Sequence, residues 1–313
     1  MYILVIKQLM IMLLIAISGF VVTKKFKFGA KEQKFVSTIL IYFINPCLIV
    51  SHFNMEFNAE RLKALGLVFL LSVVIYFVLI LLAMILLRKN PVGGKDYISL
   101  ERLSVVFTNC AFIGIPLISG VFPDSNGVFY LLAFIMTFNI FLWTFGYYSV
   151  CGKIHVKKVV TNPNIVALFI GLAVFCCPVK LPQVLSKSME MIASLNTALA
   201  MFLLGMLFTG FKSIDKTLIL RVVRVCFIKD VVAMLVVLAV LYGAFRLFAN
   251  VDEIRLMCYV CYIAALCPVG MSVSSFAVIF NKDESYSGLL VLVTSVICVV
   301  TLPLSVALAE KIF

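Results

Sequence analysis

Charged residues are scarce in this 313-residue sequence, where aspartate, glutamate, lysine and arginine together make up 13%. A typical soluble domain carries about a quarter charged residues and is nearer half apolar. Here the apolar fraction is 64%, and a soluble fold of this length could not hide so many apolar side chains. Soluble classes are therefore excluded, and we expect an integral membrane protein. The net charge of +12 does not indicate nucleic-acid binding, because excess Lys and Arg in such a protein belong to cytoplasmic loops.

Metal-ligand and disulfide patterns are also missing. The ten cysteines lie mainly inside apolar runs, where cysteine behaves as a small hydrophobic residue. Cys258 and Cys261 form a CxxC pair, but no second Cys or His pair at ligand spacing accompanies it. The two histidines, His52 and His155, stand alone as well. We therefore expect neither a metal nor a cofactor.

What the sequence has in abundance is long apolar runs. A membrane-spanning helix needs about 20 mostly apolar residues, and ten runs are close to that length. In order, these predicted spans are 2–22, 35–53, 64–87, 103–122, 128–151, 164–179, 189–210, 217–248, 255–280 and 286–309. The sequence therefore predicts an all-α integral membrane fold with ten transmembrane helices.

Lysine and arginine are unevenly distributed between the predicted spans. The loops after spans 1, 3, 5, 7 and 9 hold more than twice as many as the opposite side, and the first of these loops is rich in lysine. The positive-inside rule places these loops in the cytoplasm. We expect a multi-pass protein of the cell (inner) membrane, surrounded by lipid, with both termini extracytoplasmic. Whether two copies associate as a homodimer is left open.

Ten spans divide into two sets of five. Because five is odd, similar halves would lie in the membrane with opposite orientation, as in many secondary transporters. We expect a first five-helix repeat at 1–151, a short cytoplasmic linker at 152–163 and a second five-helix repeat at 164–313.

Spans 4 and 9 each contain helix-breaking residues near the middle. Span 4 reads TNCAFIGIP over 108–116, and span 9 reads CPVGMSVSS over 267–275. Proline removes a backbone donor and clashes with the carbonyl four residues earlier. In lipid such a break persists only where protein or a water-filled cavity covers it. Matched breaks in the two halves indicate a transport site, although two proline-kinked packing helices would give a similar pattern.

The two breaks suggest what such a site would bind. Half-helices that begin at the midplane direct the positive ends of their dipoles at it, which favours an anion. No cluster of carboxylates faces the breaks. The residues that we expect at this site are Asn109, Gly114, Pro116, Pro268, Gly270 and Ser272.

Span 8 contains adjacent charges, Lys229 and Asp230. Ionisable residues within spans are costly and usually functional, so Asp230 is a candidate for proton coupling, with Arg224 or a group of another span as its partner. The alternative is that the pair sits near the inner end of a long helix and that Lys229 extends to the cytoplasm.

Six segments, taken in order and spacing, are similar to the auxin efflux carrier family. They are YFINPCLI at 42–49, NCAFIGIPL at 109–117, NPN at 162–164 with IGL at 170–172, AMFLLG at 200–205, AALCP at 264–268 and TLPL at 301–304. The resemblance covers essentially all ten spans. The short loop between spans 5 and 6 favours the bacterial permease branch over the long plant carriers.

The resemblance implies a fold like that of bile-acid symporters and sodium/proton antiporters. Spans 1, 2, 6 and 7 would form a scaffold, and spans 3–5 and 8–10 a transport domain. The broken helices 4 and 9 would cross at Pro116 and Pro268, with Asn109 beside the substrate. Asn45 and Ser51 of span 2 would face the crossing.

These observations predict a secondary transporter that moves a small organic anion, in particular a carboxylate, by alternating access. An ion-coupled symporter of another small solute stays open, with a proton carried by Asp230 or sodium held at the span 9 break. A non-transporting receptor or a channel on the same scaffold is a further alternative. An intramembrane enzyme would need a nucleophile, a metal or a carboxylate pair deep in the bilayer, and none is evident in the sequence.

Overall fold

The computed structural model describes residues 1–88, 97–123, 125–152, 161–177, 181–210 and 216–313. Within these ranges every regular element is a helix. The α-helices are α1 (Tyr2–Phe26), α2 (Ala30–Ile39), α3 (Asn45–Phe53), α4 (Ala59–Leu86), α5 (Ile98–Val106), α6 (Gly114–Val121), α7 (Gly127–Phe141), α8 (Tyr147–Cys151), α10 (Pro163–Cys176), α11 (Gln183–Leu207), α12 (Lys216–Phe227), α13 (Met234–Leu247), α14 (Ile254–Leu266), α15 (Met271–Ile279) and α16 (Glu284–Ala309). Short π-helical or 3₁₀ segments continue some of them: η1 (Leu40–Ile44), η2 (Leu142–Gly146), η3 (Phe208–Gly210) and η4 (Ile228–Ala233).

Within the described residues, seven helical segments are long and apolar enough to cross a bilayer. They are Tyr2–Phe26, Ala30–Phe53, Ala59–Leu86, Gly127–Cys151, Gln183–Leu207, Leu218–Leu247 and Glu284–Ala309. Large apolar side chains such as Leu14, Phe77 and Leu304 are more than half exposed on them, a surface that lipid tails can cover. The prediction of an all-helical membrane protein is confirmed.

The predicted spans 4, 6 and 9 are not among these seven segments. Span 6 corresponds to α10, which has only 14 residues. Spans 4 and 9 are each divided in two, into α5 and α6 and into α14 and α15. The interruptions that the sequence predicted in spans 4 and 9 are therefore present.

Side-chain caps determine where several helices begin. The Asn58, Asn162 and Asp283 side chains accept backbone N–H hydrogen bonds at the starts of α4, α10 and α16. Pro163 occupies the first turn of α10, where a missing N–H costs nothing. α10 therefore begins one residue before the predicted start of span 6 at 164.

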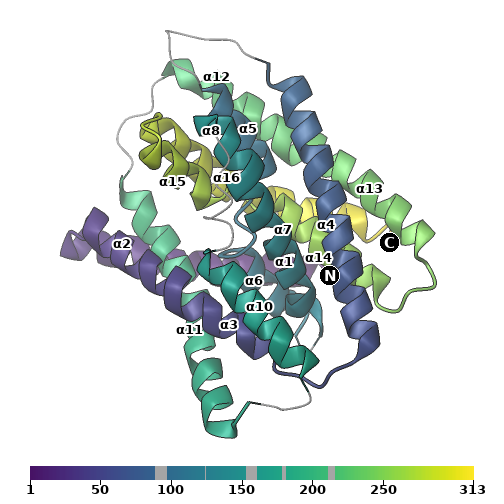
Figure 1. The fold of residues 1–313 in the computed structure, drawn as a ribbon. Coiled ribbons are helices and arrows are strands. Elements are labelled where there is room, and N and C mark those ends of the chain that lie inside the picture. Colours follow the sequence, from purple (N-terminus) through teal and green to yellow (C-terminus); the bar gives the residue numbers. More distant parts are fainter. Residues whose placement is uncertain (89–96, 124, 153–160, 178–180, 211–215) are drawn as a thin grey trace.

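The helices pack in two groups. In the first group, α1 packs along α11, and α3 packs against α10 and α11. In the second group, α4 packs on α7 and α13, α14 packs on α7 and α13, and α16 packs on α12 and α15. Figure 1 shows α2, α3 and α11 on one flank of the molecule and α4 and α13 on the opposite flank. Both halves of the sequence contribute to each group.

Candidate functional site

The two interrupted helices meet at their interruptions. Thr108 and Val269 form an isolated antiparallel bridge. The Asn109 N–H donates to the Pro268 carbonyl at 2.7 Å, and the Gly270 N–H donates to the Phe107 carbonyl at 3.0 Å. The unwound segments therefore satisfy each other's backbone groups, as buried backbone in a membrane requires. We call this pairing the crossover.

Side chains complete the hydrogen bonding at the crossover. Pro268 has no N–H, so the Ala264 carbonyl loses the donor that a helix would supply. The Thr108 hydroxyl donates to that carbonyl at 2.7 Å. The Val269 N–H donates to the Thr294 hydroxyl of α16 at 3.1 Å. Thr108 and Thr294 are both buried, which explains why polar residues occur inside apolar runs here.

The crossing involves one of the two expected prolines. Pro268 lies in the unwound segment and pairs with Asn109, as expected. Pro116 instead lies inside the first turn of α6, after the interruption. A proline in the first turn is compatible with a helix start, because the N–H it lacks has no partner there. Thr108 and Asn109 therefore occupy the place in span 4 that the resemblance gave to Pro116.

A cavity of about 470 Å³ lies beside the crossover. Both helix groups contribute to its wall: η1, α3 and α10 come from the first group, and α15, α7 and the unwound part of span 4 come from the second. Its amide residues are Asn45, Asn109, Asn139, Asn162 and Asn164. Its hydroxyl residues include Ser37, Thr108, Thr161, Ser272 and Ser275, and its large apolar residues include Phe112, Phe138, Trp143 and Phe276. The cavity is thus an amphipathic chamber at the interface between the groups.

The cavity has polar but uncharged walls. No Asp, Glu, Lys, Arg or His side chain is among the described residues that line it. Two helices begin at the wall: α15 follows Gly270, which provides no side-chain cap, and α10 follows Asn162. Each start carries the positive end of a helix dipole. Within the described residues, Ser272 Oγ, Asn45 Oδ1 and Asn164 Oδ1 are buried without a hydrogen-bond partner.

Half of the expected site residues line this cavity: Asn45, Asn109, Gly270 and Ser272. The other four do not. Gly114 packs behind the crossover, where an added Cβ would lie 3.7 Å from Cys110, Cys267 and Leu131 atoms. Ser51 lies further along α3, Pro268 contributes its carbonyl to the pairing, and the Pro116 carbonyl accepts a hydrogen bond from Gln8 at 3.0 Å.

Several lining residues were not among the expected site residues. Asn139 is one of them, and its Oδ1 accepts a hydrogen bond from Asn162 Nδ2 at 3.3 Å. The same two amides nevertheless face the cavity. Asn162 could have been identified as a site residue only if the α10 start was known to lie beside the crossover.

The charged pair of span 8 lies in η4. Lys229 is 1% exposed, so the alternative in which it extends to the cytoplasm is wrong. Neither Lys229 Nζ nor Asp230 Oδ2 has a hydrogen-bond partner in the described chain, and neither residue lines the cavity. Arg224 is not the partner of Asp230, because its Nη2 binds Glu101 Oε2 at 2.5 Å.

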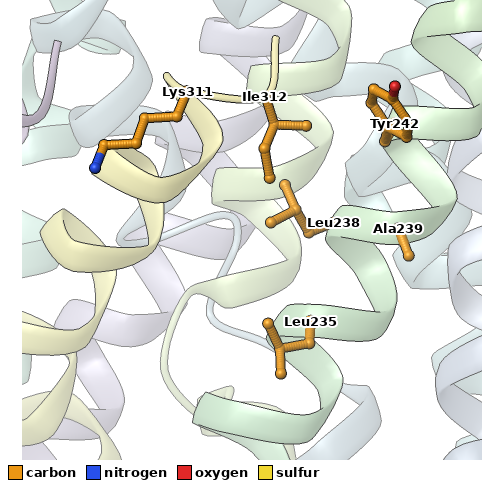
Figure 2. Close-up of a pocket in the computed structure, with 6 residues that line it drawn as sticks. All are labelled: Leu235, Leu238, Ala239, Tyr242, Lys311 and Ile312. Atoms are coloured by element: carbon orange, nitrogen blue, oxygen red, sulfur yellow. The ribbon is translucent and has the colours of Figure 1, made fainter.

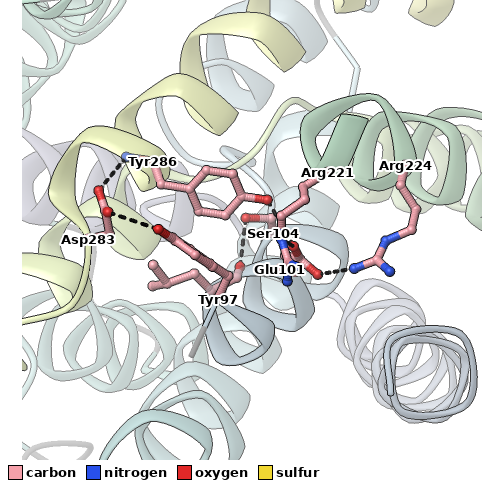
Figure 3. Close-up of polar contacts among 8 residues, drawn as sticks. Tyr97, Glu101, Ser104, Arg221, Arg224, Asp283 and Tyr286 are labelled. Atoms are coloured by element: carbon pink, nitrogen blue, oxygen red, sulfur yellow. Dashed lines mark hydrogen bonds and ion pairs between the residues drawn. The ribbon is translucent and has the colours of Figure 1, made fainter. Parts of the chain in front are cut away.

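Glu101 falls between the predicted spans 3 and 4, but it is fully buried in α5. Its other oxygen, Oε1, accepts from Arg221 Nε at 2.7 Å and from the Tyr286 hydroxyl at 3.0 Å. The Arg221 guanidinium lies over the Tyr97 ring, 5.1 Å from its centroid. Figure 3 shows the carboxylate between the two arginines of α12 and Tyr286 of α16. This cluster, which we call the Glu101 cluster, joins α5, α12 and α16.

A second hollow of about 420 Å³ lies between α13 and the residues after α16. Figure 2 shows Leu235, Leu238 and Tyr242 along α13 facing Ile312, with the Lys311 amine directed away from them. It lacks the convergent polar groups of a binding site, and lipid tails suit its apolar wall.

Comparison with known proteins agrees with the resemblance. The sequence model of the family described as membrane transport protein matches residues 4–155 and 148–306. An uncharacterized transporter of Schizosaccharomyces pombe is 25% identical over 153 residues, which are 43% of this chain and 34% of that protein. The chain therefore spans about a third of the length of that relative. On the family match, which covers nearly the whole chain, this protein belongs to the membrane transport protein family, the family of the auxin efflux carriers.

Proposed function

We propose that this protein is a secondary transporter that moves a small organic anion, in particular a carboxylate, by alternating access at the crossover. The observation that carries the proposal is the cavity beside paired helix interruptions, at the interface of two helix groups. Transporters bind cargo where discontinuous helices meet and move one group of helices against the other. We assign Asn109, Asn45, Gly270 and Ser272 to the binding of cargo.

The walls of the cavity favour an anion. The start of α15 carries the positive end of a helix dipole, and the Asn109 amide and the Ser272 hydroxyl can donate hydrogen bonds. A cation would find no carboxylate among the described lining residues. Carboxylate oxygens accept several such donors at once, and Phe138 and Trp143 can contact an apolar body.

We further propose that the chain has ten spans in two inverted repeats, 1–151 and 164–313. Helix starts recur at a nearly constant interval: Ala59 and Lys216 begin α4 and α12, and Gly127 and Glu284 begin α7 and α16. The interruptions after Val106 and Leu266 follow the same interval. The first helix group would be the scaffold and the second the transport domain, with both termini extracytoplasmic in the cell membrane.

The binding proposal can be tested on purified protein by ligand-dependent thermal stability. Dicarboxylates, indole acids and amino acids are screened with and without sodium. A ligand that binds only the folded state raises the melting temperature by mass action. We expect a carboxylate to do so in the wild type, but not in Asn109→Ala. Asn196→Ala is the matched control, because Asn196 is buried but does not line the cavity.

The same screen tests the coupling ion. Asp230 is our candidate for proton coupling, and the Ser272 hydroxyl with the carbonyls at the span 9 break is the candidate for sodium. A carboxylate shift that requires sodium would favour the second. If no acid stabilises the protein, or if Asn109→Ala responds as the wild type does, the site assignment is wrong.

A further inference from the structure

The cavity is open on one side of the crossover. Ser275 and Ile279 line it near the end of α15 and are exposed, and Lys282 follows shortly after. Thr161, at the start of α10, is exposed as well. Thr161 follows a segment that contains Lys153, Lys157 and Lys158, and α15 ends at the loop after span 9. Both belong to the set of loops that holds more Lys and Arg than the opposite side. The chamber therefore opens toward the basic side of the molecule.

On the opposite side, three aromatic rings close the space between the two helix groups. Phe53 of α3 and Phe129 of α7 have ring centroids 5.2 Å apart. Phe175 of α10 lies 5.7 Å from Phe129 and 6.3 Å from Phe53. All three side chains are buried. Because Phe53 and Phe175 belong to the first group and Phe129 to the second, this aromatic cluster bridges the groups.

A polar contact joins the groups on the same side. Gln8 of α1 donates through Nε2 to the Pro116 carbonyl of α6 at 3.0 Å. The Gln8 amide also lies against Gly120 of α6. A Cβ added at Gly120 would come within 2.2 Å of Gln8 Cδ. α1 belongs to the first group, and α6 continues from the crossover. Only a residue without a side chain at 120 leaves room for this hydrogen bond.

The helices themselves show how far these contacts lie from the chamber. Along α3, Phe53 follows the cavity residue Asn45 by eight residues, and Phe175 follows Asn164 on α10 by eleven. At 1.5 Å per residue, the aromatic cluster lies roughly 12–16 Å beyond the cavity wall. We propose that the Phe53–Phe129–Phe175 cluster and the Gln8–Pro116 hydrogen bond form the gate on the side away from the basic loops.

This inference rests on the proposed alternating access. If the two groups move against each other, the contacts that bridge them on the closed side must separate before cargo leaves there. Each aromatic pair contributes enough to shift a two-state balance roughly two- to tenfold. Phe129 touches both other rings of the cluster, so its truncation should populate the state open on the far side. In this scheme the structure represents the state in which the cavity is open toward the basic side and the gate is closed.

The gate is tested by chemical access to the chamber, a readout that needs no substrate. Ala111, which lines the cavity, is replaced by cysteine. Sealed vesicles of either orientation are treated with a membrane-impermeant maleimide. Tandem mass spectrometry of the peptides separates this cysteine from the ten native ones, because fragment ions distinguish it from the adjacent Cys110. The variants added are Phe129→Ala and Gly120→Ala, the second of which displaces the Gln8 amide. Phe141→Ala is the control, because Phe141 pairs with Phe77 and Tyr76 inside the second group.

We expect Ala111→Cys alone to be labelled from the basic side only. Phe129→Ala and Gly120→Ala should each raise labelling from the far side at least twofold, and Phe141→Ala should not. Labelling from both sides without a gate variant, or gate variants that match the control, would overturn the inference. The protein could also be labelled from one side only, gain far-side labelling in the gate variants, and yet transport no organic anion. That result would support the gate and reject the proposed cargo.

Discussion

Replacing Glu101 by glutamine tests whether the Glu101 cluster holds α5 in place. The carboxylate is 0% exposed, and the arginine that binds Oε1, Arg221, is 11% exposed. Glutamine keeps the shape but removes the charge, so Arg221 would be left buried without a counter-charge. Breaking a buried ion pair in this way costs about 3–5 kcal/mol. Arg224 is 38% exposed and can turn to water, so we take the lower end of that range.

The assay is thermal unfolding of purified protein in detergent. A loss of about 3 kcal/mol corresponds to a decrease in melting temperature of roughly 5–10 °C for a chain of this size. Glu60→Gln is the control, because Glu60 is exposed in the first turn of α4 and should matter little. Adding Arg221→Met to Glu101→Gln removes the stranded charge and should recover part of the loss.

If Glu101→Gln melts at the same temperature as the Glu60→Gln control, the buried carboxylate does not stabilise the fold. The double variant with Arg221→Met could also prove less stable than Glu101→Gln alone. Either result would mean that the carboxylate is not the counter-charge that keeps α12 against α5.

Three further substitutions test other contacts by the same melting assay. Thr108→Val should lower the free energy of unfolding by about 2 kcal/mol, because it leaves the Ala264 carbonyl unsatisfied. Thr137→Val should lower it clearly less, because the Thr137 hydroxyl bonds only within its own helix. Equal losses would contradict this. Lys229→Met should raise the melting temperature by at least about 2 °C, because it replaces a buried amine that has no hydrogen-bond partner in the described chain with an apolar side chain. A decrease would contradict this. Pro116→Ala should lower the free energy of unfolding by less than about 1 kcal/mol, because this proline lies in the first turn of α6. A loss above about 2 kcal/mol would show that Pro116 shapes the interruption of span 4.

The features that sequence predicted well depend on local chemistry. Asn162 and Pro163 are a cap and a first-turn proline, so the start of α10 follows from the chain itself. The interruptions of spans 4 and 9 follow from helix-breaking residues in apolar runs, which require a partner in lipid. That partner is the other interruption, as the Asn109–Pro268 hydrogen bond shows.

The features that sequence missed depend on residues far apart in the chain. Glu101 reads as part of a polar loop, and only the approach of α12 and α16 to α5 explains how a carboxylate is buried there. Pro116 reads as the centre of a break, but the chain had already unwound at Phe107 to pair with span 9, so the proline falls within the next helix start. Lys229 reads as a side chain that extends to water, yet the packing of η4 against α4 and α5 encloses it.

Transport of an organic anion at the crossover can be measured by counterflow. Proteoliposomes are loaded with an unlabelled carboxylate that stabilises the protein, and radiolabelled carboxylate is added outside. A carrier that alternates between two sides accumulates label transiently above equilibrium, and the rate saturates with concentration. We predict this behaviour for the wild type and its loss in Asn109→Ala. Label that only equilibrates, without saturation, would indicate a channel, and no flux at all would indicate a receptor; either result would contradict the account.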